Sequence, residues 1–352
     1  MGITILGWGT ALPTRTVTNK DLEQTLDTSD EWIFERTGIR ERRIGTHTAD
    51  LAIEAGRAAL ANAAVDPASI DLTILCTTTP DETIPATSAR VHYELGLGGG
   101  AFDLNAACSG FVYGLVVAEG LLATGVKRIL LIGAETLSRV TNWEDRNTAV
   151  LFGDGGGALV LERSTDAGQL LAWDLGLDGE ARAILKAEVG GTIAMEGREV
   201  FRRAVRVVVD SARKTLEAGG YQSADVALLV PHQANIRIIR AACDRLGIDR
   251  ERAAIVLDRT GNTSSASIPL AWVDAIERGR LDDGDLVLLT GFGAGMTWGS
   301  ALLRWRTPST EAPAARPEAA RPGTVAPGSV GSGDVGSGNV GSDDVGDVSN
   351  GE

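Results

Sequence analysis

Short apolar runs alternate with longer amphipathic stretches along the first 306 residues of the chain. Continuous apolar runs of the kind that buried strands show occur at residues 3–12, 71–78, 128–134 and 226–230. Helical patterns are predicted over residues 49–64, 88–95, 200–217, 235–246 and 264–278. This alternation predicts an α/β fold, in which helices cover buried sheets.

Two short helices are predicted near the N-terminus. Asn19 stands where it would cap a helix over residues 21–27, and Ser29 is expected to cap the next helix. In that second helix Trp32 and Arg36 are four residues apart, so they share one face.

Two glycine-rich segments in opposite halves of the chain have similar patterns. Residues 149–163 read AVLFGDGGGALVLER, and residues 288–305 read LLTGFGAGMTWGSALLRW. Each is predicted to form two strands around a glycine-rich turn, and their separation is far longer than a solenoid repeat. We therefore predict two duplicated α/β halves, residues 1–165 and 166–306.

Residues 307–352 differ in composition from the rest of the chain. An Ala/Pro/Arg-rich stretch gives way to repeats of the form V-G-S-x-D/N, with almost no large apolar residue. Such a segment cannot bury enough apolar surface to offset its ordering entropy, so a disordered C-terminal tail is predicted. A linker to a separate partner is the alternative.

Composition and charge narrow the classes of function. The 352-residue chain has 43% hydrophobic residues and a formal net charge of −14, which argues against general nucleic-acid binding. The three cysteines are an odd number without a CxxC motif, so we expect reduced thiols in a cytoplasmic protein. We expect neither a signal peptide nor a membrane span, because the N-terminus reads as a strand and no apolar run is long enough.

The stretch DLNAACSGF, residues 103–111, is the first candidate for chemistry. A short apolar run leads into it, and a helical pattern begins just after Cys108. A strand, a sharp turn with a cysteine and a helix outline a nucleophile elbow, where backbone N–H groups and the helix dipole favour a thiolate. A buried, inert cysteine is the alternative.

Two polar residues in the second half strengthen the reactive interpretation. His232 directly follows a buried strand, which we predict to be a central one, at the carboxyl edge where open α/β sheets bind ligands. Asn262 lies in a glycine-containing loop before a helix, although a simple turn asparagine would look the same. Together Cys108, His232 and Asn262 favour a cysteine acyl-transfer site over three structural residues, whereas His47 and His92 look like loop and packing residues.

Five motifs in this order resemble a known family. AACSGF, FGDG, VPHQAN, GNTS and GFGAGMTWGSALLRW, with DTSDEWIFERTGIRERR near the N-terminus, are similar to the β-ketoacyl-acyl-carrier-protein synthase III enzymes of the thiolase superfamily. The likeness covers residues 1–306. It implies a thiolase-like α/β fold, with the two halves in a five-layered αβαβα arrangement.

The resemblance also implies a decarboxylating condensation that starts fatty acid synthesis. A short acyl-CoA would acylate Cys108, and malonyl-ACP would then lose CO2 and attack the acyl group. His232 and Asn262 would stabilise the enolate, and the backbone N–H groups of Cys108 and Ala294 would form the oxyanion hole. The family commonly has glycine at the position of Ala294. No cofactor and no metal are implied.

Further roles follow from the resemblance alone. Arg237 would bind the acidic acyl carrier protein, and the enzyme would be a homodimer in which Ile84 closes the partner's acyl pocket, with room for primers larger than acetyl. The path of residues 180–197 over this pocket is left open. The residues implied for binding CoA are Thr28, Trp32, Arg36, Arg146 and Asn235.

Three other functions stay open from the sequence. The nearest is a starter-unit condensing enzyme or acyltransferase of a polyketide or other secondary pathway, with malonyl-CoA as a possible acceptor. A cysteine hydrolase also uses Cys, His and Asn, but no protease motif surrounds Cys108. A non-enzymatic binding protein would tolerate loss of Cys108.

Overall fold

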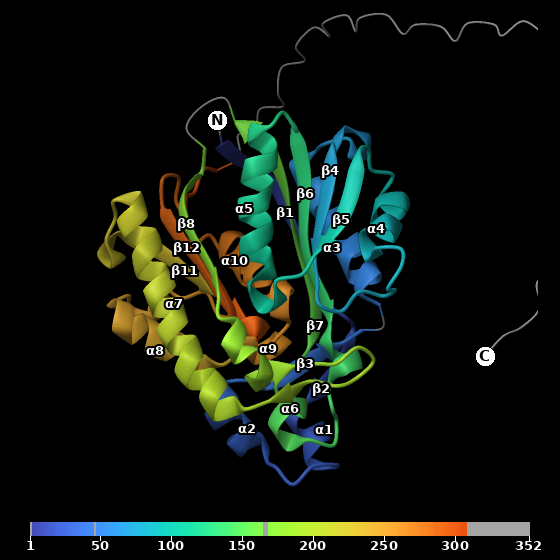
Figure 1. Ribbon diagram of the computed structural model, residues 1–352, viewed down its shortest axis with the longest axis vertical. Coiled ribbons are helices and arrows are strands. Elements are labelled where there is room, and N and C mark those ends of the chain that lie inside the picture. The colour runs from blue at the N-terminus through green and yellow to red at the C-terminus, as the bar shows by residue number, and fades with distance from the viewer. Residues whose placement is uncertain (1, 46, 165–167, 308–352) are drawn as a thin grey trace, which may run out of the picture. The chain divides into compact units, whose positions relative to one another are not determined.

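Two sheets form the framework of the protein (Figure 1). The computed structural model describes residues 2–45, 47–164 and 168–307. The first sheet has the order β1-β7-β6-β4-β5 and the second has the order β11-β12-β13-β8. The strands of the first sheet are β1 (Gly2–Ala11), β4 (Leu72–Cys76), β5 (Gly100–Leu104), β6 (Arg128–Thr136) and β7 (Asp154–Ser164). Those of the second are β8 (Leu170–Leu177), β11 (Val226–Pro231), β12 (Leu286–Gly293) and β13 (Thr297–Arg304).

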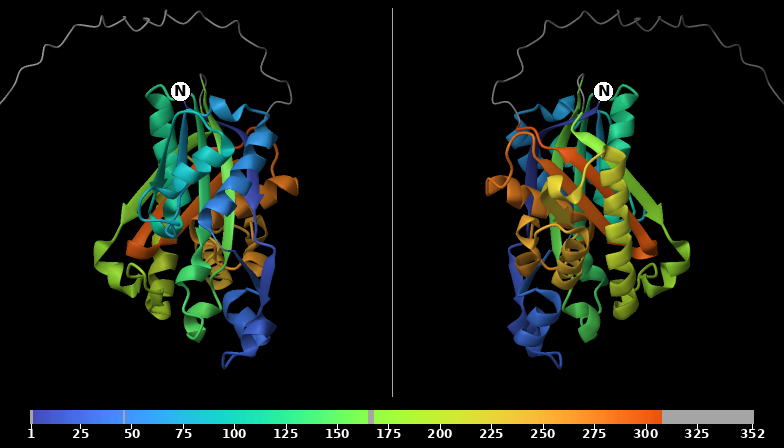
Figure 2. Two further views of the ribbon diagram at one scale, coloured as in Figure 1. Left: turned by 90° about the vertical axis from the view of Figure 1, so that its right-hand side faces the viewer. Right: turned by 90° about the vertical axis from the view of Figure 1, so that its left-hand side faces the viewer.

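Helices and sheets alternate in five layers, as Figures 1 and 2 show. Helices α3 (Thr48–Ala63) and α4 (Thr87–Leu95) share a core cluster with one face of the first sheet. Helices α5 (Gly110–Ala123) and α10 (Ser267–Glu277) pack between the two sheets, and their cluster includes Trp272 and Phe111. Helices α7 (Gly197–Gly219) and α8 (Ile236–Leu246) cover the outer face of the second sheet. The predicted αβαβα thiolase-like arrangement is therefore confirmed.

The shorter elements complete the fold at one end of the sheets. Helices α1 (Asn19–Glu23) and α2 (Asp30–Thr37) lie there with a ribbon of β2 (Arg15–Thr18) and β3 (Glu41–Ile44). Helix α6 (Arg146–Ala149), the small ribbon β9 (Leu185–Lys186) with β10 (Ala194–Met195), and helix α9 (Leu257–Thr260) make up the rest.

Small residues explain why α3 packs so closely against β1. A Cβ atom placed on Gly7 would lie 2.4 Å from the backbone nitrogen of Ala63, and one on Gly9 would lie 2.4 Å from that of Ala59. No side chain larger than hydrogen fits at either strand position. The alanine-rich pattern of residues 49–64 is thus matched by glycines on the strand that it covers.

Several predicted elements need correction. Residues 149–163 do not form two strands around a turn: Gly155 and its neighbours are inside β7, whose antiparallel partners are β1 and β6. Thr18, not Asn19, caps α1, because its side chain accepts the N–H of Asp21. Ser29 does cap α2, and β12 and β13 do flank a glycine-rich turn as predicted.

The predicted tail, residues 307–352, lies outside the described residues except for Thr307. The backbone N–H of Thr307 donates to the carboxylate of Asp283 at 3.0 Å.

Candidate active site

Cys108 lies on a tight turn between β5 and α5. Residues Ala107–Ser109 form a single 3-10 turn, and Ala107 has a φ of 49°. A residue with a side chain rarely adopts this left-handed conformation, so surrounding contacts must hold it. The hydroxyls of Ser109 and Thr297 both donate to the carbonyl of Ala106, at 2.8 and 3.0 Å, which ties the turn to the start of β13. The predicted elbow is present.

The charge state of Cys108 differs from the expectation. Burial of the sulfur is the largest cause that raises the pKa of Cys108, to about 12, and the side chain of Ser264 only partly opposes it. The thiol is therefore neutral at pH 7 in the free protein. Desolvation outweighs the hydrogen bonds from the Ser264 side chain and the Cys108 backbone, which favour the thiolate, and the nearby charge of Glu135 also raises the pKa of this thiol.

His232 follows β11, which is an edge strand of its sheet rather than a central one. Its ring packs edge-on against Phe292, with 5.4 Å between centroids, and Nδ1 lies 2.6 Å from the hydroxyl of Ser267. Burial lowers the pKa of His232 to about 3, so the imidazole is neutral at pH 7. No partner of Nε2 is present among the described residues.

Asn262 is held by its own loop. Its backbone N–H donates to the carbonyl of Leu151, and its carbonyl accepts the N–H of Gly153. The side-chain Oδ1 accepts the N–H of Ser264 at 2.9 Å. Because the backbone N–H of Ser264 can only donate, the side-chain atom of Asn262 that it contacts must be the oxygen. The Nδ2 donor of Asn262 is then left without a partner in the described part of the chain.

A cavity of about 720 Å³ brings these three residues together. Its wall also includes Leu185 and Met195, so the segment 180–197, whose path was left open, reaches the cavity through the β9–β10 ribbon. Among the described residues that line it are four arginines and no carboxylate: Arg36, Arg146, Arg198 and Arg237. Such a wall suits an anionic ligand.

The predicted nucleotide-binding residues mostly lie at the cavity. The guanidinium of Arg36 lies 4.9 Å from the ring centroid of Trp32, and that of Arg146 lies 5.0 Å from it. Asn235 also lines the cavity, but its side chain caps α8 and donates to the carbonyl of Arg36 at 3.0 Å. Thr28 is not in the cavity wall, and its buried hydroxyl has no partner among the described residues.

Three further predicted residues have different positions. Arg237 lines the cavity, is exposed, and stacks over Phe201 at 5.4 Å. Ala294 follows Gly293, a wall residue, and is not among the described residues with a positive φ, so alanine is accommodated there without backbone strain. Ile84 is 87% exposed and lies outside the cavity of its own chain.

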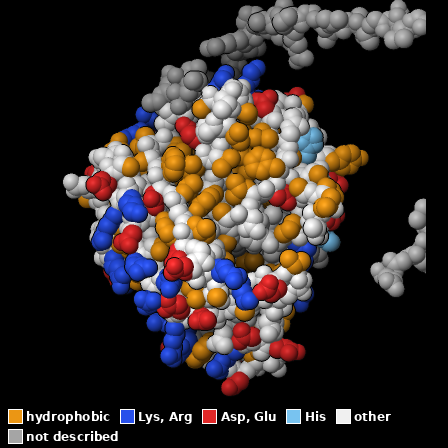
Figure 3. Space-filling view, viewed as in Figure 1, with side chains coloured by type: hydrophobic (Ala, Val, Ile, Leu, Met, Phe, Trp, Pro, Cys, Tyr) orange, Lys and Arg blue, Asp and Glu red, His pale blue; other side chains and the backbone are white. Residues whose placement is uncertain are grey.

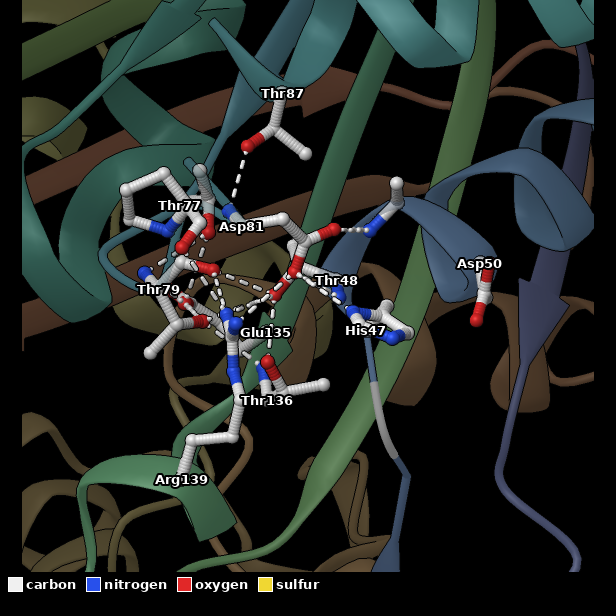
Figure 4. A network of polar contacts seen from close by, with 12 residues as sticks. His47, Thr48, Asp50, Thr77, Thr79, Asp81, Thr87, Glu135, Thr136 and Arg139 are labelled. Carbon is white, nitrogen blue, oxygen red and sulfur yellow. Dashed lines mark hydrogen bonds and ion pairs between the residues drawn. The ribbon is translucent and has the colours of Figure 1, made fainter. Parts of the chain in front are cut away.

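A buried carboxylate behind the site carried no signal in the sequence. Glu135, fully buried on β6, accepts hydrogen bonds from the hydroxyls of Thr77, Thr78 and Thr79 and from Ser265, three residues after Asn262. Figure 4 shows this network continuing to Asp81 and Arg139, whose side chains form a 3.1 Å ion pair. The carboxylate of Asp81 also accepts two N–H groups at the start of α3, so this network fixes the loop that carries Ile84.

Other features of the described residues bear on ligands. No group of three or more His, Cys, Asp or Glu residues that could hold a metal ion is present in that part of the chain. A separate hollow of about 600 Å³, lined by Arg15, Ser138 and Trp143 among others, contains none of the predicted site residues. None of the described helices is both long and apolar enough to cross a membrane.

Family models match two parts of the chain. Residues 102–179 match 3-Oxoacyl-[acyl-carrier-protein (ACP)] synthase III, and residues 216–305 match the C-terminal model of the same name. The first stretch contains Cys108, and the second contains His232 and Asn262.

Similar proteins span nearly the whole chain. A β-ketoacyl-[acyl-carrier-protein] synthase III of Roseiflexus castenholzii is 50% identical over 321 residues, which cover 86% of this chain and 97% of that protein. The crystal structure of 3-oxoacyl-[acyl-carrier-protein] synthase III from Aquifex aeolicus superposes with a TM-score of 0.85 at 45% identity, covering 86% of this chain and 100% of that one. The priming β-ketosynthase of the R1128 polyketide pathway superposes with a TM-score of 0.84 at 36% identity, covering 88% and 97%.

Proposed function

Because the chain belongs to the 3-oxoacyl-[acyl-carrier-protein] synthase III family, we propose that Cys108, His232 and Asn262 carry its condensing reaction in two steps. The enzyme is an acyltransferase that condenses an acyl primer with malonyl-ACP and so initiates fatty acid synthesis. The assignment of each step to these residues, and the acyl-CoA primer, are what we propose here.

In the first step Cys108 takes the acyl group from acyl-CoA. Its sulfur bonds to the thioester carbonyl, the C–S bond to CoA breaks, and the thiol proton leaves with free CoA. The backbone N–H groups of Cys108 and Ala294 stabilise the tetrahedral oxyanion. Trp32 stacks on the adenine. Arg36 and Arg146, whose guanidinium groups lie within about 5 Å of the Trp32 ring, hold phosphates. Asn235, in the cavity wall, contacts the pantetheine arm, whereas a contact of Thr28 with the base edge would require its hydroxyl, which is buried outside this wall, to become exposed.

In the second step malonyl-ACP loses CO2, and the resulting carbanion attacks the acyl group. The C–C bond forms as the bond to Cys108 breaks, and a proton from solvent restores the thiol. The observation that carries this proposal is that His232 Nε2 and Asn262 Nδ2, neither of which has a partner among the described residues, lie in one cavity with Cys108. Donors already in place at a developing enolate oxygen lower the barrier by several kcal/mol.

The test follows the mass of the protein. The parent should gain one acyl group on Cys108 from acyl-CoA and lose it when malonyl-ACP is added. Cys108→Ala should gain none. Asn262→Ala should still be acylated but should not be discharged, and acylation of Cys108→Ala or normal discharge of Asn262→Ala would contradict these roles.

A second function has one observation in its favour, the likeness to the priming β-ketosynthase of a polyketide pathway. An enzyme of that kind would share the acyl-Cys108 intermediate but could use malonyl-CoA as acceptor. Discharge of the acyl-enzyme by malonyl-CoA, with none by malonyl-ACP, would favour this function over the first.

The carrier protein is proposed to dock beside Arg237. This guanidinium has no carboxylate partner among the described residues, whereas Arg202 and Arg203 on the adjacent α7 are both paired with Glu199. An acidic carrier protein would therefore meet an available positive charge at the rim of the cavity.

We propose a homodimer, with Ile84 closing the acyl pocket of the partner. Figure 3 shows hydrophobic side chains gathered over α5 and the strands beside it, and an exposed apolar patch of this kind suits a protein–protein interface. Strand β5 is an edge strand of the first sheet, and in the homodimer it pairs with β5 of the second copy of the chain.

We also propose a cytoplasmic location, with which the three free cysteines agree.

A further inference from the structure

Ser267, the first residue of α10, is fully buried directly behind His232. Its hydroxyl oxygen lies 2.6 Å from Nδ1 of His232 and 3.2 Å from the backbone nitrogen of Gln233. No other hydrogen-bond partner of this hydroxyl is present among the described residues.

The two contacts together determine where the hydrogens lie. The N–H of Gln233 can only donate, so it uses one lone pair of the Ser267 oxygen. The hydroxyl hydrogen then needs an acceptor, and the one within reach is Nδ1 of His232. If Nδ1 carried a proton instead, a buried hydroxyl hydrogen would have no acceptor, which native proteins avoid.

The surroundings of His232 keep the ring neutral. Its described contacts are a hydroxyl and the ring of Phe292, and neither is a carboxylate that would stabilise an imidazolium. Gln233 holds the adjacent backbone, because its side chain donates to the carbonyl of Ala254 and accepts the N–H of Val256.

We propose that Ser267 is a positioning residue that holds His232 in the tautomer with the hydrogen on Nε2, so that this nitrogen donates into the cavity. The proposal rests on the function proposed above, in which that donor faces the malonyl thioester oxygen. It makes His232 a hydrogen-bond donor throughout the cycle and not the base that takes the thiol proton of Cys108.

The tautomer can be measured without any substrate. The chain has three histidines, so the ¹⁵N-labelled protein gives at most three pairs of ring nitrogens, and loss of one pair in His232→Ala assigns the site. We expect Nε2 protonated and Nδ1 unprotonated in the parent. A proton on Nδ1 of the parent would overturn the proposal, whatever the activity.

Kinetics separate positioning from a structural role. Ser267→Ala should lower the rate of malonyl decarboxylation by about 10- to 100-fold and leave acylation of Cys108 unchanged. In a His232→Ala background the same substitution should have no further effect on decarboxylation, because its partner is gone. Ser211→Ala, at another buried serine on α7, is the matched control and should lower neither rate.

The opposing results are equally definite. An equal loss with and without His232, or a loss of acylation as large as the loss of decarboxylation, would show a structural serine and overturn the proposal. A parent that is not acylated, or that discharges neither malonyl thioester, would refute the proposed function, while the ring-nitrogen spectrum would still decide the tautomer.

Discussion

Replacing Gly293 by alanine tests how closely the two halves of the site meet. Gly293 ends β12 with a φ of −157°, an extended conformation that alanine adopts freely. An added Cβ would nevertheless lie 2.5 Å from the backbone nitrogen of Cys108 and 2.8 Å from the Cβ of Ala107. Both atoms belong to the strained elbow, so the perturbation acts on the nucleophile without touching a catalytic side chain.

The size of the effect follows from these distances. Ordinary contacts of a Cβ begin near 3.4 Å, so roughly 0.9 Å must be taken up by moving the elbow or the strand. Overpacking of this kind should lower the free energy of unfolding by about 1–3 kcal/mol. A displacement near 1 Å can slow a positioned reaction about 10²-fold, and the Cys108 N–H is also the oxyanion-hole donor that we propose.

The assay is the rate of acylation of Cys108 by acyl-CoA, followed by quenched mass spectrometry, with urea unfolding in parallel. Gly291→Ala is the control, since its Cβ would meet nothing closer than 3.3 Å and lies on the same strand. We expect at least a tenfold slower acylation in Gly293→Ala than in Gly291→Ala. Equal rates in the two variants would refute the idea that the elbow has no room to move.

Four other changes test separate parts of the structure. Arg42→Met should lower the free energy of unfolding in urea by about 3 kcal/mol or more, because the fully buried guanidinium donates to three acceptors that would be left unpaired. A loss no larger than that caused by the control substitution Arg15→Met, at an exposed arginine, would contradict this. Arg237→Glu should weaken use of malonyl-ACP far more than acylation from CoA in steady-state assays, and equal losses would point to a structural Arg237. Between pH 7.5 and 5.5 the free energy of unfolding should fall by about 1.4 kcal/mol more in the parent than in His232→Gln. The reason is that His232, with a folded pKa of about 3, stays unprotonated in the folded protein, whereas in the unfolded chain it protonates near pH 6.5. An equal fall in the two proteins, measured by urea unfolding, would show that the ring is not desolvated. Ile84→Phe should shift acylation away from butyryl- and isobutyryl-CoA toward acetyl-CoA, and an unchanged preference would remove Ile84 from the acyl pocket.

The spacing of apolar residues along the sequence predicted the helices that bury one continuous face and the strands that bury both faces. The apolar run of β6 and the amphipathic pattern of α7 are long, so each specifies its partner layer without help from elsewhere. The glycine-rich residues 154–157 were assigned wrongly because glycine has no pattern of its own. There the close approach of Pro269 and Leu51, each within 3 Å of where an added Cβ would lie, requires glycine inside a strand.

That Cys108, His232 and Asn262 lie in one cavity was predictable because each follows a recognisable strand or turn. Their ionisation was not, since it depends on burial by distant elements: the expected thiolate of Cys108 is opposed by desolvation that no local motif reveals. Glu135 was missed for a related reason. Its hydroxyl partners come from a loop 56–58 residues earlier and from Ser265, 130 residues later.

The side chains of Asn262 and His232 are oriented by backbone N–H groups, which can only donate hydrogen bonds. A backbone N–H fixes the amide of Asn262, and another, acting through the hydroxyl of Ser267, fixes the ring of His232. Both arrangements aim the remaining donor into the cavity before a substrate arrives, so little reorganisation is needed when charge develops on an enolate. A substitution that keeps the side chain but removes its fixed partner should therefore slow decarboxylation while leaving the acyl-enzyme step intact, which distinguishes orientation from mere presence of the donor.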